Sequence, residues 1–168
     1  MVGVVPQGMH QHRIDCQTEA AVACSVWREL FEELFDGREV AGEDPHLDPL
    51  WFLREHPGMS WFARNDGFEL ICTGLGFDAL AGTYDPTFLL VVYDDGFFSR
   101  FRSQMRTNWE FALENTRSPF VGTDQLQHLE SLIAARDWAG SSLYSFARAL
   151  AVLRKLRPGC LPDEFGDL

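Results

Sequence analysis

The chain has 168 residues and a mass of 19.1 kDa, which fits one domain whose core needs no disulfide or metal for stability. Hydrophobic residues make up 46% and charged residues 23%, a globular balance that excludes a disordered chain. With 14 basic and 25 acidic residues, the formal net charge is −11, so we expect neither nucleic acid nor an anionic membrane as a partner.

Neither a membrane-spanning segment nor an export signal is evident. No apolar run approaches the roughly 18 residues of a spanning helix, and the first residues lack the basic start of a signal peptide. The 4 cysteines are scattered without a C-x-x-C pair, which makes a zinc site or a disulfide framework a poor fit. We therefore expect a cytoplasmic protein with reduced thiols.

The first half of the chain predicts a strand and two helices. Residues 2–11 are β-branched at first and are then interrupted by Pro6, which indicates a short strand. Apolar residues recur at i, i+3 and i+4 over 19–35, which predicts an amphipathic helix. Within 50–65, the apolar pattern meets Pro57, so we expect a short helix followed by an extended segment.

The second half mixes β-rich and helical segments. The β-rich runs predict three strands, the first two separated by Gly82 and the Asp85-Pro86 pair, at 68–77, 87–93 and 108–113. Helical patterns occur at 97–106, 124–136 and 142–156, the last one stopped by Pro158-Gly159. Without a linker between these segments, we predict a single α/β domain over 1–168, with a mixed sheet and helices on its faces.

One side of the predicted helix 19–35 is strongly acidic. At 100° per residue, Glu29, Glu32, Glu33 and Asp36 lie opposite the apolar stripe. Arg28 lies at the border of that stripe, so we expect it to be partly buried and paired with a carboxylate. Like charges at this spacing weaken a helix by a few tenths of a kcal/mol per pair, and a hard divalent cation would relieve the repulsion. The alternative is an ordinary solvated acidic face.

The literal residues of this segment resemble a known signature. Residues 28–33 read R-E-L-F-E-E, which is similar to the R-E-(aliphatic)-x-E-E core of the Nudix box of Nudix hydrolases. Upstream, Pro6-Gln7-Gly8 resembles the P-G-G turn that precedes the box, and Glu19 resembles its first glutamate. The match is therefore strict over 28–33 and looser over 6–37.

The resemblance implies a fold and a site. The fold would be a Nudix-like α/β/α sandwich with a mixed sheet, and the short segment before residue 6 leaves open whether the first strands of the family are missing. Mg²⁺ or Mn²⁺ would bind at Glu29, Glu32 and Glu33, with Glu32 and Glu33 catalytic and Arg28 as their structural support. Gly8 and Glu19 would belong to the loop that leads into the box.

A small basic cluster is a second candidate. Arg100 and Arg102 lie close together in sequence, and guanidinium groups can hold phosphates. The alternative is a solvated helix face whose arginines pair with nearby acids.

Three functions follow. The first is a metal-dependent hydrolase of a nucleoside diphosphate linked to another moiety, which the intact R-E-L-F-E-E favours. The second is a non-catalytic Nudix-fold sensor or binding domain for a nucleotide-like or phosphorylated metabolite. It is favoured by the longer loop and by Phe35, which stands where the box has a glycine. The third is an acidic protein-interaction module without a ligand. Association into a homodimer is left open.

Overall fold

A computed structural model of the chain describes residues 2–4, 22–35, 48, 50–79, 82–105, 125–134 and 142–163. The predictions made for Gly8, Glu19 and the strand at 108–113 lie outside these residues. The chain divides into two compact units, the first within Met1–Leu70 and Leu90–Thr116 and the second within Ile71–Leu89 and Arg117–Leu168. We describe each unit by itself; the single domain over 1–168 stays a prediction.

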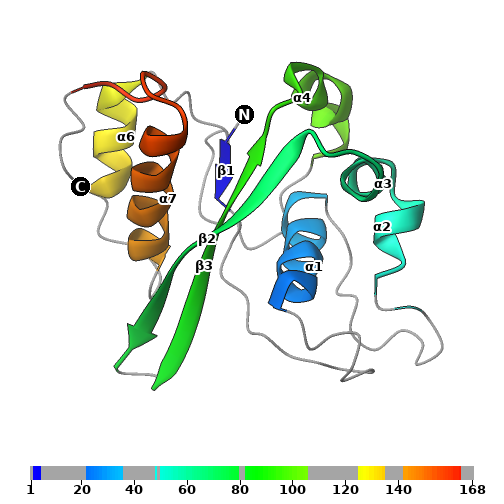
Figure 1. The fold of residues 1–168 in the computed structure, drawn as a ribbon, viewed down its shortest axis with the longest axis horizontal. Helices are drawn as coiled ribbons and strands as arrows, with labels where there is room; N and C mark the ends of the chain where they lie inside the picture. Colours follow the sequence, from blue (N-terminus) through cyan, green and yellow to red (C-terminus); the bar gives the residue numbers. More distant parts are fainter. Residues whose placement is uncertain are drawn as a thin grey trace. The chain divides into compact units, whose positions relative to one another are not determined.

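The sheet has three strands in the order β1-β3-β2, namely β1 (Val2–Val4), β2 (Phe68–Asp78) and β3 (Thr83–Val92). Figure 1 shows β2 and β3 as a long twisted hairpin. Its turn includes Gly82, whose φ of +69° lies in the left-handed region that favours glycine. The predicted strands 68–77 and 87–93 are confirmed.

The start of β3 differs from the prediction. β3 begins at Thr83, so Asp85-Pro86 lies inside the strand and does not separate it from β2. Proline removes one N–H group from the ladder and is tolerated where a strand has a neighbour on one side alone. Among the described strands, β1 spans 3 residues and β3 spans 10, so most of β3 has β2 as its one described neighbour.

Helix α1 (Val22–Leu34) confirms the described part of the predicted helix 19–35. It buries Val26, Leu30 and Phe31 on the apolar stripe. The stripe holds α1 against the other helices of the first unit, because Phe31 stacks on Phe52 with ring centroids 4.8 Å apart and planes at 4°.

The extended segment predicted after the short helix in 50–65 is wrong. Helix α2 (Phe52–Glu55) is followed directly by helix α3 (Pro57–Arg64). Pro57 occupies the first turn of α3. Backbone N–H groups in the first turn make no hydrogen bond within the helix, so the absence of this group in proline costs nothing there, and the fixed φ of proline suits a helix. The proline therefore starts a helix here and does not end one.

Helix α4 (Asp95–Phe101) continues into the 3₁₀ helix η1 (Arg102–Gln104), which confirms the predicted helix at 97–106 within the described residues. Asp94 caps α4, because its Oδ1 accepts a hydrogen bond of 2.8 Å from the backbone N–H of Gly96. An aspartate before a helix is a common capping signal.

The core of the first unit is aromatic. Trp61 lies against Phe97 with ring centroids 4.7 Å apart, and Phe62 packs on Trp27 at 5.3 Å. Phe52, Met59 and Phe97 are at most 1% exposed. This cluster brings α1, α3 and α4 together with the adjoining ends of β2 and β3.

Gly58 lies close to the ring of Phe35. A methyl group added at Gly58 would lie 2.5 Å from Cε1 of the buried Phe35 ring. We expect Gly58→Ala to lower the free energy of unfolding by about 1–3 kcal/mol, as overpacking does. Urea unfolding would measure the change. Gly67→Ala is the matched control, because its added methyl group meets Trp61 at an ordinary 3.5 Å. Equal stability of the two variants would contradict this packing.

The second unit contains helices α6 (Leu126–Ile133) and α7 (Ser142–Leu156), which confirm the predicted helices at 124–136 and 142–156 within the described residues. Arg148 of α7 donates from Nε and Nη2 to the backbone carbonyl of Thr73, at 3.0 and 2.8 Å. The hydroxyls of Thr73 and Thr87 lie 2.8 Å apart across the hairpin. The bonds from Arg148 attach α7 to the hairpin, and the contact between the two threonines joins its strands.

The chain thus combines helices with a sheet, and the α/β class is confirmed at that level. Throughout the described segments, no helix is long and apolar enough to cross a membrane.

Candidate functional site

The acidic residues predicted as the site lie on the second half of α1. Glu29, Glu32 and Glu33 are all half-buried, and they follow one another at i, i+3 and i+4. At this spacing, side chains lie on the same side of a helix. Their backbone is fixed from the other side, where Leu30 and Phe31 are at most 5% exposed.

Arg28 is buried next to this face. It is 8% exposed, and its Nη2 lies 3.4 Å from Oε1 of Glu29. The side chains of the pair are 10% and 17% exposed, so water screens their attraction only weakly. The prediction that Arg28 is partly buried and paired with a carboxylate is confirmed.

The donor set suits a hard cation, since carboxylate oxygens are the ligands that Mg²⁺ and Mn²⁺ prefer. Within the described ranges, no group of three or more His, Cys, Asp or Glu side chains is arranged to hold a metal ion. Mg²⁺ keeps several waters and is usually held by one or two carboxylates together with substrate phosphates. If a metal binds here, Glu29, Glu32 and Glu33 are the carboxylates of α1 that would hold it.

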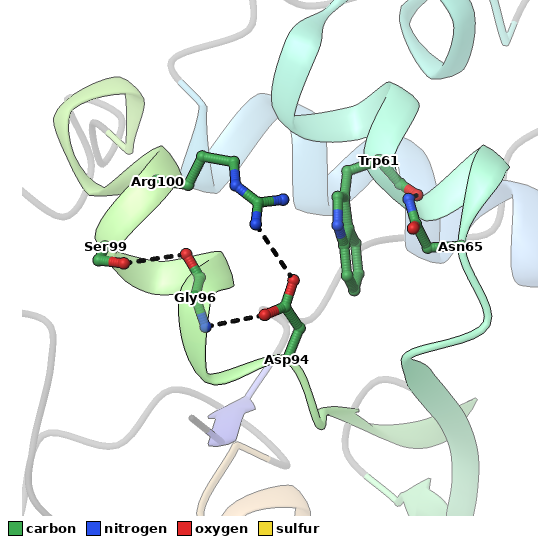
Figure 2. A network of polar contacts seen from close by, with 6 residues as sticks. All are labelled: Trp61, Asn65, Asp94, Gly96, Ser99 and Arg100. Atoms are coloured by element: carbon green, nitrogen blue, oxygen red, sulfur yellow. Dashed lines mark hydrogen bonds and ion pairs between the residues drawn. The ribbon is translucent and has the colours of Figure 1, made fainter.

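Arg100 and Arg102 each make a different contact with another residue. Arg100 Nη2 lies 3.7 Å from Oδ2 of Asp94, the residue that caps α4 (Figure 2). The indole of Trp61 lies beside this ion pair, and Asn65 donates to the Trp61 carbonyl at 2.8 Å. Arg102 instead covers the Phe98 ring, with Cζ 5.2 Å from the centroid.

Sequence reasoning missed His56, which caps α3. Its Nδ1 accepts from the backbone N–H of Met59 at 3.4 Å, so this nitrogen carries no proton. The ring lies between Phe35, 4.9 Å away, and Phe31, 5.5 Å away. Burial lowers the pKa of His56 below its ordinary value, because the cation loses hydration there. The proline that follows it was the available signal of a helix start.

We expect His56 to make stability depend on pH. Since its pKa is lower in the folded state, the unfolded state binds more protons as the pH falls below about 6.5. The stability that neutral His56 contributes to the folded state is complete above that pH, and it is lost as the pH falls through the lower pKa of the folded state. Urea midpoints at several pH values between 7.5 and 5 would measure the loss. His56→Asn keeps a capping acceptor that does not titrate, so its midpoint should change less over this range. Parallel curves for the two proteins would contradict the assignment.

Comparison with models of known families, with curated proteins and with solved structures finds no match to this chain.

Proposed function

We propose that the chain is a metal-dependent hydrolase of a nucleoside diphosphate linked to another moiety, with its site on the acidic face of α1. The observation that carries this proposal is the buried ion pair between Arg28 and Glu29. In the Nudix box, which residues 28–33 resemble, the arginine orients the metal-site glutamates through such a pair. A buried pair on a solvated, functionless face would cost desolvation without an evident return.

The residues of α1 then have distinct roles. Glu29 is held by Arg28 and, together with Glu32 and Glu33, offers carboxylate oxygens to a divalent cation. Mg²⁺ or Mn²⁺, when bound, would neutralise the bridging phosphates and make phosphorus easier to attack. Glu32 or Glu33 accepts the proton of the attacking water as a general base.

Several wider properties belong to the same proposal. The fold would be a Nudix-like α/β/α sandwich with a mixed sheet, formed by one domain over 1–168 in the cytoplasm. The partner would be a nucleotide-like small molecule, and neither nucleic acid nor a membrane. Arg100 and Arg102 remain candidates for phosphate binding; for Arg100, a phosphate would have to compete with Asp94.

The test combines turnover with binding. Wild-type protein is incubated with a panel of nucleoside diphosphate derivatives and Mg²⁺ or Mn²⁺, and cleavage of the pyrophosphate bond is followed. Calorimetric titration of the metal into wild type and Glu33→Gln, with and without nucleotide, measures the site directly. We expect weak metal binding without nucleotide, and weaker binding in the variant. Equal heats in the two proteins would refute the site.

A second candidate, a non-catalytic sensor for the same class of ligand, is favoured by Phe35. This residue stands where the box has a glycine, and it is 5% exposed, with its ring against His56 and Gly58. A core aromatic residue at that position ties the end of α1 to α3 and leaves less freedom for a loop. If no derivative is cleaved while one still raises the melting temperature, the sensor is the better proposal.

A further inference from the structure

Two Asp-Gly pairs of the first unit have almost the same neighbours in sequence but lie in different local structures. Residues 65–68 read N-D-G-F, and residues 94–97 read D-D-G-F. Asp66-Gly67 lies in the connection between α3 and β2, whereas Asp95-Gly96 lies in the first turn of α4. Both aspartates are exposed. A third pair, Asp36-Gly37, lies outside the described residues. A difference in reactivity between the first two pairs would therefore come from the structure.

An Asp-Gly pair can rearrange without an enzyme. The glycine nitrogen attacks Cγ of the aspartic acid side chain, so that an N–C bond forms and the N–H proton leaves with the carboxyl hydroxyl as water. A second water then opens the cyclic imide. Opening at Cγ restores aspartate, whereas opening at the backbone carbonyl breaks the original peptide bond and gives isoaspartate, whose main chain runs through Cβ and Cγ. Glycine favours the attack, because it has no Cβ and its backbone turns freely.

The backbone of Gly96 is held away from this reaction. Its N–H donates to Oδ1 of Asp94 at 2.8 Å, and its carbonyl accepts from the hydroxyl of Ser99 at 3.0 Å (Figure 2). Before the Gly96 nitrogen can attack Asp95, the bond to the Asp94 carboxylate has to break and the first turn of α4 has to open. The helix cap therefore protects this pair.

The nitrogen of Gly67 has no such restraint in the described part of the chain. Gly67 is tied to the fold through its carbonyl, which accepts from the backbone N–H of Tyr93 at 2.8 Å. Among the described residues, neither the Gly67 N–H nor the Asp66 carboxylate has a hydrogen-bond partner. The attack on Asp66 therefore has no hydrogen bond of its two reacting groups to break.

We propose that Asp66 is a site of spontaneous isoaspartate formation in the folded protein. The rearrangement adds one carbon atom to the main chain directly before Gly67. It displaces the carbonyl that is bonded to Tyr93 and the backbone that lies near the ring of Trp61. The modified chain should therefore unfold at a lower urea concentration than the unmodified chain. This proposal does not depend on the acidic face of α1, which carries the proposed hydrolase.

The full chain is incubated near neutral pH and then digested with a protease specific for glutamate, which places the two pairs in separate peptides, 56–69 and 70–110. Chromatography with mass spectrometry separates the aspartate and isoaspartate forms, which have the same mass, and fragmentation locates the isoaspartate. We expect at least about tenfold more isoaspartate at 66 than at 95, because Gly96 first has to leave a hydrogen bond to a charged group. In urea, where the cap of α4 is lost, the two positions should react at similar rates.

Two variants identify the reacting groups. Asp66→Glu keeps the charge but would have to close a ring one atom larger, so no isoaspartate should form in peptide 56–69. Gly67→Ala places a methyl group beside the attacking nitrogen and should slow the reaction; this methyl group meets Trp61 at an ordinary 3.5 Å, so the fold is kept. Neither variant should change the yield at 95.

Equal yields of isoaspartate at 66 and 95 in the native protein would overturn the proposal. An increase in urea that is as large at 66 as at 95 would also overturn it, because the fold would then protect both pairs alike. None of these outcomes involves metal or nucleotide, so failure of the hydrolase proposal leaves them unchanged.

Discussion

Arg28→Ala should lower the free energy of unfolding by about 3–5 kcal/mol, the usual cost of removing one partner of a buried ion pair. The loss combines two effects. Glu29 would keep a charge in a site where its side chain is 17% exposed, and the loss of the Arg28 side chain, a residue that is 8% exposed, would leave a cavity. The urea midpoint and the dependence of unfolding on urea concentration would measure the change.

Arg54→Ala is the matched control for that experiment. Arg54 also pairs with a carboxylate, that of Asp48, but its side chain is 63% exposed. An exposed pair contributes under about 1 kcal/mol, so this variant should stay close to wild type. If Arg28→Ala unfolds at the wild-type urea midpoint, the ion pair with Glu29 does not contribute to the stability of the fold.

Glu32→Gln and Glu33→Gln should each reduce pyrophosphate-bond hydrolysis by at least about 100-fold, if the proposed hydrolase is correct. This is the scale expected when a metal ligand or a general base is lost. Wild-type activity should require metal and rise toward alkaline pH, as water deprotonation becomes easier. Rates and melting temperatures measured on the same preparations separate chemistry from folding.

Unlike their activity, the stability of Glu32→Gln and Glu33→Gln should stay close to that of wild type. Glutamine keeps the size of glutamate and can still hydrogen-bond, so both variants should melt close to the wild-type temperature. Glu55→Gln, on the exposed surface of α2, should keep full activity. If Glu32→Gln and Glu33→Gln both hydrolyse substrate as fast as wild type, the acidic face of α1 is not the catalytic site.

The elements that sequence predicts well are those whose pattern is local. The hairpin follows from two β-rich runs around Gly82, and α1 follows from an apolar stripe. The burial of Arg28 was predictable because helix geometry alone puts it at the border of that stripe. In each case the residues that decide the structure are close together in the chain.

What sequence misses here depends on residues far apart in the chain. Pro57 was interpreted as a break, whereas the core places it in the first turn of α3. His56 is an unusual capping residue, and its ring lies against Phe31 of α1 and against Phe35, which follows α1, both more than twenty positions earlier in the chain. Leu75, Phe77 and Tyr84 of the hairpin are exposed although all three are large and apolar, and the strand sequence alone does not say which face a helix covers.

The close approach of Phe35 to Gly58 ties two positions of the sequence to each other. A side chain at 58 avoids this overpacking only if the one at 35 becomes smaller. Contacts of this kind make the effects of substitutions non-additive. The effect of a substitution at 58 on stability therefore depends on the size of the side chain at 35, so the residue that follows α1 and the first turn of α3 are coupled.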